Sequence, residues 1–257
     1  MTIRKFGWVP DKQDDRDYHY SIPWGVTIQP ITDLSHYFPS DLFPLDQDGL
    51  GFCYAFTPIE QLWAEWVIEK KAPVELSPMM LGYLVEVIEG TVGQDMGGMP
   101  RDAIKALLKT GVCTNALWPF DPSKLGVQPP PECYAQAQTE KLLQYKRALT
   151  LDQIRGILSS GRPCGLGFHV FENFPMDSRD GMVPMPAGAD QGGHDVTIVG
   201  HNDYTRRVKF LNHWRFDDGT PWGDHGYGYL PYDYFNPIKT GFRPLTGDHW
   251  VLMKVEA

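Results

Sequence analysis

The sequence lacks paired cysteines, long apolar runs and clusters of basic residues. None of the four cysteines stands in a CxxC pair, which argues against a zinc knuckle or a thioredoxin-type site. No apolar run approaches the roughly 20 residues that cross a membrane, and no Lys/Arg cluster has the density that neutralises nucleic-acid phosphates. With a net charge of −9, the chain is expected to bind neither membrane nor nucleic acid, and we predict no metal site and no cofactor.

The N-terminal stretch also lacks the apolar core of a secretory signal peptide, because "MTIRKFGWVPDKQDDRDYHY" is largely polar. A chain of 257 residues is long enough to build a core without a disulfide framework. We therefore expect free thiols and a reducing compartment, and predict a cytoplasmic protein. The sequence does not indicate an oligomeric state.

Glycine and proline are abundant, at 26 and 22 residues, well above typical usage. This excess predicts many turns and long loops rather than a helical bundle. Residues 1–45 show little periodicity, and we predict an extended segment that wraps over the fold. The rest is expected to form one domain.

Helical patterns come first along the chain. Apolar residues recur at spacings of three and four after Cys53, which predicts a helix that begins there. Further helices are predicted over 77–88, opened by Ser77 as N-cap, and over 100–109 and 151–159.

Strand patterns follow the helices. Alternating β-branched and aromatic residues between turn signals predict strands over 163–171, 195–203, 207–214 and 249–256. This order predicts an α+β protein with two packed halves, helical over 46–135 and β-rich over 136–257.

Cys53 stands where a reactive thiol would be activated. The thiolate is the reactive form of cysteine, and the N–H groups and dipole at a helix N-terminus favour an anion. An imidazole partner, a third group to orient that imidazole and donors for an oxyanion would complete a nucleophilic site. Taken alone, a cysteine at an apolar helix start is more often a core residue.

His194 and Asn212 are the candidate partners. His194 follows two glycines and leads into a predicted strand, and Asn212 ends the next one. Adjacent antiparallel strands would bring the two side chains together. His194 lies roughly 140 residues after Cys53, within the papain-type spacing, and Asn212 falls slightly beyond it. His201 is a nearby competitor, but the Gly-Gly context and the paired asparagine favour His194.

Five blocks in order resemble the papain-like cysteine peptidases of the C1 family. They are a glutamine and cysteine block, a Gly-Gly turn with a helix, an aromatic-Pro-aromatic, a Gly-His and an Asn-x-Trp block. They comprise Gln47, Gly51, Cys53, Tyr54, Ala55 and Phe56; "DMGGMPRDAIKALLKTGV"; "WPF"; Gly193 and His194; and Asn212, Trp214, Trp222, Gly223, Gly226 and Tyr227. The resemblance implies a papain-like fold, with a cleft between a helical half and an antiparallel β half.

The resemblance also implies a role for each site residue. Cys53 would be the nucleophile and His194 the general acid/base, while Asn212 would orient the imidazole. The Gln47 side chain and the Cys53 N–H would form the oxyanion hole. Trp214 would shield the His194–Asn212 hydrogen bond from water.

Substrate-binding residues are implied by the same comparison. Gly97 and Gly98 would pair with the substrate backbone as an added strand, next to Met99. Gly193 and Asp195 would border the cleft on the β side. Asp195 stands where the family has a small apolar residue beside the S2 pocket, so a carboxylate there either favours a basic or polar P2 side chain or points away.

Several positions depart from the family pattern. Leu50 and the region of Asp95 lack the cysteines that bridge these two places in secreted members. Phe52 replaces a small residue, and Tyr54 replaces a tryptophan. The 45 N-terminal residues are too short for the family's inhibitory propeptide, and they resemble the leader of bacterial or phage-type members without one.

The resulting prediction is a thiol-dependent peptidase that acts on a peptide or protein substrate through a Cys-His-Asn acyl-enzyme mechanism. A peptide ligase or transamidase would use the same residues. A catalytically inactive scaffold would keep the fold without the activity. The natural substrate, the P2 preference and the regulation of activity are not indicated by the sequence.

Overall fold

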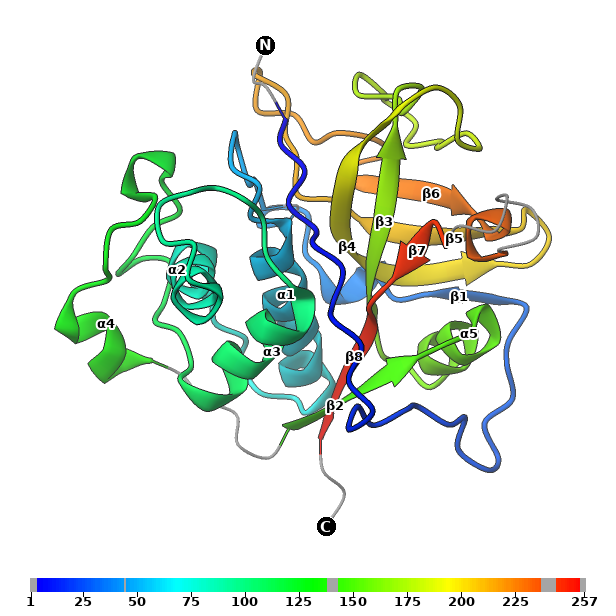
Figure 1. The fold of residues 1–257 in the computed structure, drawn as a ribbon. Helices are drawn as coiled ribbons and strands as arrows, with labels where there is room; N and C mark the ends of the chain where they lie inside the picture. Colours follow the sequence, from blue (N-terminus) through cyan, green and yellow to red (C-terminus); the bar gives the residue numbers. More distant parts are fainter. Residues whose placement is uncertain (1–3, 44, 138–142, 237–243, 255–257) are drawn as a thin grey trace.

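The computed structural model describes residues 4–43, 45–137, 143–236 and 244–254. A helical half and a β-rich half lie side by side, and the N-terminal segment runs between them on the face shown in Figure 1. Within these ranges, no helix is both long and apolar enough to cross a bilayer. The description does not include residues 1–3 and 44 of the predicted N-terminal segment. It also does not include residues 255–256 of the last predicted strand.

The helical half is built around α1, which begins at Cys53 as predicted. It contains α1 (Cys53–Ile68), α2 (Pro78–Glu89), α3 (Pro100–Lys109), a 3-10 turn (Pro122–Lys124) and α4 (Pro131–Gln136). The Ser77 hydroxyl accepts a hydrogen bond from the Met80 N–H at 3.0 Å, so α2 has the predicted cap. The sequence did not predict α4, since its proline-rich surroundings indicate a connection.

The strands of the β half pair antiparallel in each of the described ladders. Its main sheet has the order β6-β5-β4-β3-β7, with β1 paired to β4, and a second sheet joins β2 to β8. The strands are β1 (Ile31–Asp33), β2 (Leu143–Ala148), β3 (Cys164–Phe171), β4 (Asp190–Asn202), β5 (Arg207–Leu211), β6 (Tyr227–Pro231), β7 (Thr246–Gly247) and β8 (His249–Lys254). Helix α5 (Leu151–Ser159) packs against this half, and 3-10 turns cover Ser35–Tyr37 and Tyr232–Phe235.

Each half has its own apolar core. One core lies between the main sheet and α5, and another lies among α1, α2 and α3. Trp250 and Leu252 of β8 belong to the helical core although they come from the end of the chain. The last strand therefore joins the two halves.

A buried polar contact also connects the halves. The Glu60 carboxylate, in the middle of α1, accepts a hydrogen bond from the Thr197 hydroxyl of β4 at 2.6 Å. The same oxygen lies 3.0 Å from Nε2 of His213, just after β5, and all three residues are fully buried. Because Asn212 and Trp214 flank His213, this contact fixes the loop that carries both.

We predict that Glu60→Ala lowers the free energy of unfolding by roughly 3–5 kcal/mol, because it leaves His213 and Thr197 buried without their acceptor. Urea denaturation of the full chain measures this change. Glu132→Ala, on the exposed surface of α4, is the control and should leave stability unchanged within error. A loss below about 1 kcal/mol for Glu60→Ala would show that the contact does not hold the halves together.

Candidate active site

The predicted nucleophile stands at the first position of α1. Cys53 is fully buried, and the helix that follows it is 16 residues long, so its N-terminal dipole is fully developed. The Gly51 N–H just before it donates to the Asp95 carboxylate at 2.8 Å. This bond joins the loops near Leu50 and Asp95, the two places where the sequence lacks the bridging cysteines.

His194 and Asn212 come together on neighbouring strands, as the sequence predicted. The pairing of β4 with β5 sets Thr197 opposite Leu211, which brings His194 Nε2 to 2.8 Å from the Asn212 side-chain oxygen. The Trp214 ring stacks on the imidazole, with ring centroids 4.5 Å apart. All three side chains are buried.

The Asn212 oxygen determines which imidazole nitrogen carries the proton. It also accepts a hydrogen bond from the His213 backbone N–H at 2.9 Å, and only an oxygen can accept there, which fixes the orientation of the amide. His194 Nε2 must therefore be the donor in their shared bond. The other nitrogen, Nδ1, then has a lone pair, and it has no hydrogen-bond partner among the described residues.

The sulfur of Cys53 lies close to the residue that follows His194 on β4. The thiol contacts the backbone of Asp195, the residue after His194, and also the backbone of Gly7 and Tyr54. Burial raises the pKa of Cys53 to about 12, with the Asp195 carboxylate adding to the effect. Burial, together with the neighbouring His213, lowers the pKa of His194 to about 3. In this form both groups are neutral.

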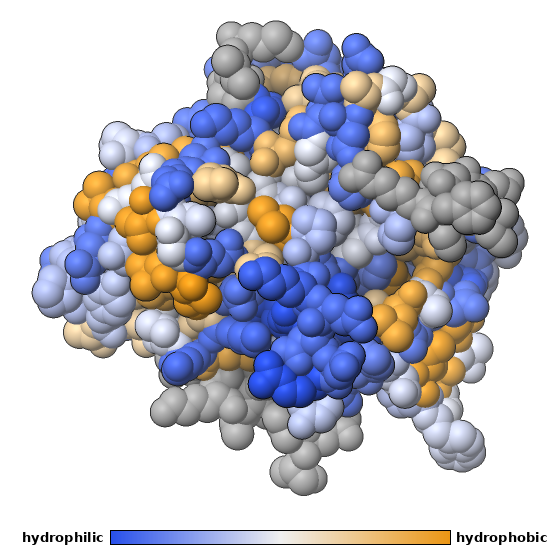
Figure 2. Space-filling model, in the orientation of Figure 1, coloured by the Kyte–Doolittle hydropathy of each residue, from blue (hydrophilic) through white to orange (hydrophobic). Residues whose placement is uncertain are grey.

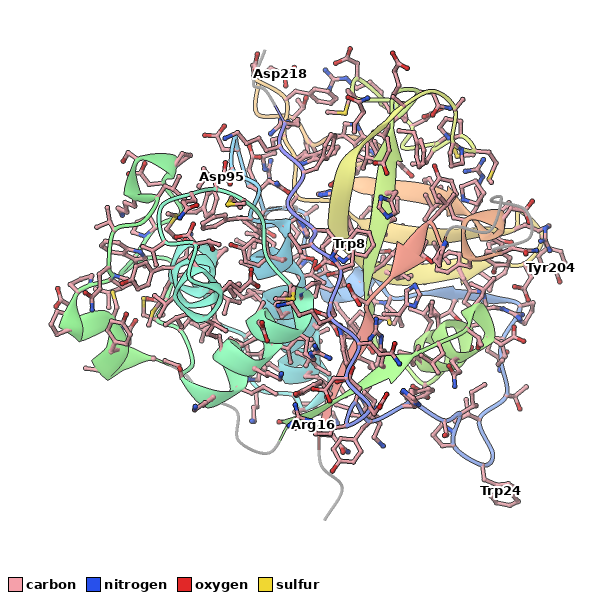
Figure 3. The ribbon with its side chains drawn as sticks, viewed as in Figure 1. Trp8, Arg16, Trp24, Asp95, Tyr204 and Asp218 are labelled. Carbon is pink, nitrogen blue, oxygen red and sulfur yellow. The ribbon has the colours of Figure 1, made fainter. Side chains whose placement is uncertain are left out.

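The N-terminal segment fills the space between the halves (Figure 3). Gly7 passes directly over the turn before Cys53: a Cβ on Gly7 would lie 1.7 Å from the Gly51 carbonyl oxygen. The Gly98 N–H donates to the Gly7 carbonyl at 2.9 Å, and the Val9 N–H donates to the Gly98 carbonyl at 3.2 Å. Trp8 forms a parallel bridge with Gly98.

The other predicted binding residues face the same segment or lie beside it. The Gly193 carbonyl accepts a hydrogen bond from the Trp8 N–H at 2.8 Å. The Gln47 amide donates to the Lys5 carbonyl at 3.2 Å and to the Leu50 carbonyl at 2.7 Å. Met99 opens α3, and its N–H donates to Glu89. The predicted site residues are thus brought together around the chain's own N-terminal segment.

Phe6 continues the segment on the other side of Cys53. Its ring lies 6.1 Å from Trp214 and 6.4 Å from His194, centroid to centroid. Lys5 pairs with Asp95 at 2.6 Å, the carboxylate that also holds Gly51. The side chains of the segment therefore touch both walls of the cleft.

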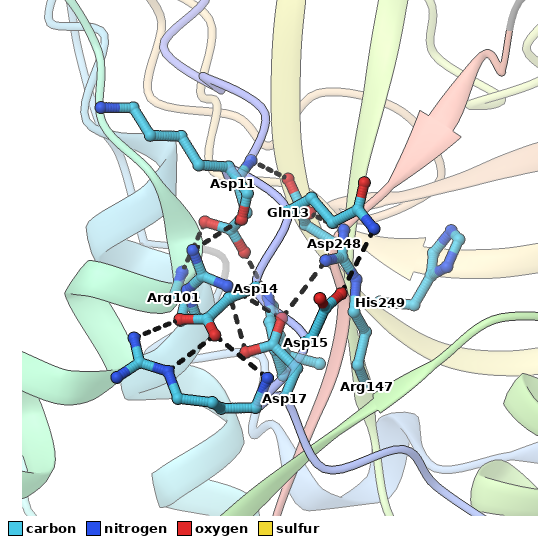
Figure 4. Close-up of polar contacts among 12 residues, drawn as sticks. Asp11, Gln13, Asp14, Asp15, Asp17, Arg101, Arg147, Asp248 and His249 are labelled. Atoms are coloured by element: carbon cyan, nitrogen blue, oxygen red, sulfur yellow. Dashed lines mark hydrogen bonds and ion pairs between the residues drawn. The ribbon is translucent and has the colours of Figure 1, made fainter.

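A cluster of charged side chains anchors the lower end of the segment (Figure 4). The Asp11 carboxylate accepts hydrogen bonds from the Trp250 indole at 2.7 Å and the Arg101 N–H at 3.1 Å. Asp17 forms a nearly buried ion pair with Arg101 at 2.8 Å. Figure 2 shows a hydrophilic area over this part of the face, where Figure 3 places Arg16.

Sequence reasoning missed three contributors to this site. They are Trp8, the Asp248 carboxylate to which its indole donates at 2.9 Å, and Glu60. Trp8 and Asp248 are 240 residues apart, so no local spacing signals their contact. Among the described residues, no group of three or more His, Cys, Asp or Glu is placed to hold a metal ion.

The chain is similar to known cysteine proteases in sequence and in fold. Residues 44–237 match the model of the papain family cysteine proteases. An uncharacterized peptidase C1-like protein of Acanthamoeba polyphaga mimivirus is 31% identical, with 98% of this chain and 88% of that protein covered. Xylellain, a cysteine protease from Xylella fastidiosa, is 30% identical with a TM-score of 0.83, covering 100% of this chain and 98% of xylellain. Procathepsin B from Trypanosoma congolense shares the fold. It is 14% identical with a TM-score of 0.73, covering 97% of this chain and 85% of procathepsin B.

We predict that Asp11 favours opening of the segment more strongly as the pH rises from about 4 to about 7. Burial, together with the nearby Asp248 carboxylate, raises the pKa of Asp11 from 3.8 to about 7 in the closed form. Closing therefore takes up a proton at Asp11 between these two values, so opening relative to Asp11→Asn increases up to about tenfold per pH unit and levels off above pH 7. Hydrogen exchange of the Trp8 and Val9 amides, corrected for intrinsic rates, measures it.

The experiment uses Cys53→Ala as the background, which excludes self-cleavage. Asp11→Asn is the matched variant, because an amide does not titrate. Both proteins keep the opposite contribution of His194, whose pKa burial lowers to about 3 in the closed form, so the difference between their pH slopes reports Asp11 alone. Equal pH slopes in the two proteins would show that Asp11 does not control the opening.

Proposed function

Because the chain belongs to the papain family of cysteine proteases, we propose that this cysteine peptidase cleaves peptide bonds through Cys53, His194 and Asn212, and that the described form is its latent state. The observation that supports this most strongly is the Asn212 oxygen, which leaves Nδ1 of His194 with a lone pair and no partner among the described residues, while the Cys53 thiol contacts the backbone of the next residue, Asp195. A scaffold that had lost its activity would have no need of this arrangement.

In the proposed mechanism, His194 Nδ1 takes the thiol proton of Cys53. The sulfur attacks the substrate carbonyl carbon, and the C–N bond breaks as His194 returns the proton to the leaving amine. Water then attacks the thioester, giving its proton to His194, and the C–S bond breaks to release the acid and the thiol.

We assign two donors to the oxyanion of the intermediate. The Gln47 side-chain amide lies in the cleft, where the Lys5 carbonyl now occupies it. The Cys53 N–H is at the first position of a helix, where no intrahelical acceptor exists. Such donors contribute on the order of 3 kcal/mol each to the stability of the transition state.

The latent state follows from the position of Gly7 and from the two neutral groups. With Gly7 over the sulfur, a substrate carbonyl cannot reach it. Release of the segment would expose Cys53 to solvent, remove the desolvation that raises its pKa, and free the amide of Gln47. The ion pair between thiolate and imidazolium then becomes accessible.

We predict that Gly7→Ala activates the full chain, because the added Cβ clashes with the Gly51 carbonyl and expels the segment. An epoxysuccinyl inhibitor should label Cys53 at least tenfold faster in Gly7→Ala than in the unaltered chain. Adding His194→Ala should abolish this labelling. Cleavage of fluorogenic peptides should follow the same order, and product analysis distinguishes hydrolysis from transfer to an added amine.

Lys12→Ala is the control, because Lys12 belongs to the segment but its side chain is exposed. Its labelling rate should match that of the unaltered chain. Equal, slow labelling of all four cysteines in Gly7→Ala would favour the inactive scaffold over the peptidase.

A further inference from the structure

His213 contacts several of the groups assigned to catalysis. Its backbone N–H donates to the Asn212 side-chain oxygen at 2.9 Å, and its carbonyl accepts a hydrogen bond from the Gln47 N–H at 2.9 Å. Its ring stacks on Phe56, with centroids 5.2 Å apart. The same ring lies edge-to-face with that of His194 at 6.0 Å. A change in the charge of His213 would therefore be felt at the catalytic imidazole.

The side chain of His213 is bound by the Glu60 carboxylate. Glu60 Oε2 lies 3.0 Å from His213 Nε2 and accepts a hydrogen bond from the Thr197 hydroxyl at 2.6 Å. The second distance falls in the range of a hydroxyl that donates to an ionised carboxylate. Glu60 is therefore ionised, and His213 Nε2 carries a proton that it donates to this oxygen.

A buried carboxylate requires a positive counter-charge. Glu60, His213 and Thr197 are all fully buried, and an ionised group in such a place is stable only when it is paired. Of the two groups that bind Glu60 Oε2, the Thr197 hydroxyl is uncharged, so the counter-charge must come from His213. Its Nδ1, which has no hydrogen-bond partner among the described residues, then carries the second proton of an imidazolium.

The positive charge of His213 acts on His194. At 6.0 Å between the ring centroids, one positive charge disfavours a second by roughly one pH unit. The closed form shows the same direction, since His213 adds to the effect of burial in lowering the pKa of His194. Of the pair, only His213 is close enough to alter this pKa, so the opposite charge of Glu60 does not cancel the effect.

Three further titratable groups lie near the rings of His194 and His213. Asp195 on β4 is fully buried, and burial raises its pKa well above the usual value, so it is neutral near neutral pH. Burial also raises the pKa of Tyr227 on β6, which stays neutral as well. The Cys53 thiolate of the active form, at the start of α1, is then the other charge beside His194.

Building on the proposed function, we propose that Glu60 and His213 are positioning residues of the peptidase: Glu60 holds His213 as an imidazolium, and this charge sets the pH above which His194 loses its proton and activity falls. Beside a thiolate alone, His194 would retain its proton to higher pH. The charge of His213 offsets part of that attraction, so His194 returns the proton to the leaving amine more readily.

The first test is the pH dependence of kcat/KM for one fluorogenic peptide in the full-length Gly7→Ala chain. Glu60→Gln should move the alkaline limb up by about one pH unit, because the amide still accepts hydrogen bonds but no longer stabilises a buried imidazolium, and His213 becomes neutral. His213→Gln should move the limb in the same direction, and it serves if Glu60→Gln fails to fold. Combining the two substitutions should move it no further than Glu60→Gln alone.

Thr197→Val is the matched control. It removes the other hydrogen bond to the same Glu60 oxygen with almost no change of shape, so it lowers stability but leaves both charges in place. Its alkaline limb should stay within about 0.2 pH unit of the Gly7→Ala chain. An unchanged limb in Glu60→Gln, or equal shifts in Glu60→Gln and Thr197→Val, would overturn the proposal.

Nitrogen-15 NMR of His213 separates this proposal from the proposed catalytic function, because it requires neither an open cleft nor turnover. In the unaltered chain near neutral pH, both ring nitrogens of His213 should carry protons, and in Glu60→Gln only one should. In Gly7→Ala combined with Cys53→Ala, Glu60→Gln should raise the titration midpoint of His194 by about one pH unit. If cleavage fails while these differences persist, the charge assignment stands and the peptidase mechanism is wrong; a neutral His213 in the unaltered chain overturns the charge assignment.

Discussion

One amide oxygen determines the chemistry of this site. Asn212 Oδ1 accepts hydrogen bonds from the His213 backbone and from His194 Nε2, and so the proton of the neutral imidazole must sit on Nε2. In the proposed mechanism, the lone pair on Nδ1 then accepts the proton of the Cys53 thiol. The stacked ring of Trp214 and the buried Glu60–His213 contact hold this arrangement away from water, which strengthens each polar contact within it.

The same site is closed by a few residues of the chain's own N-terminal segment. Burial of one tryptophan side chain removes roughly 150–250 Å² from water and contributes about 4–6 kcal/mol. Because the segment is tethered to the domain, that contribution adds to its hydrogen bonds with Gly98 and Gly193 in keeping it in place. The backbone of Gly7 and Trp8 forms hydrogen bonds with Gly98 and Gly193. An extended substrate would bind the same donors and acceptors.

Sequence reasoning recovered the parts of the structure that have local signals. The helix that starts at Cys53, the strand that carries His194 and the strand end at Asn212 follow from periodicity and spacing, and the α+β architecture follows from their order. Contacts without a local signal were missed. Trp8 reaches Asp248 across the whole chain, and an extended segment has no periodicity to show which groove it enters. The sequence pattern predicts Glu60 as a polar position on an amphipathic helix. It is buried because its two partners, Thr197 and His213, come from the other half.

The account depends most directly on the protonation of His194, which nitrogen-15 NMR of the labelled chain reports for each ring nitrogen. In the unaltered chain at pH 5, it requires a neutral ring with the proton on Nε2, because burial lowers the pKa to about 3. After Gly7→Ala opens the cleft, it requires protons on both nitrogens near neutral pH, paired with the Cys53 thiolate. A ring protonated on Nδ1 alone, or a doubly protonated ring in the closed chain, would contradict it.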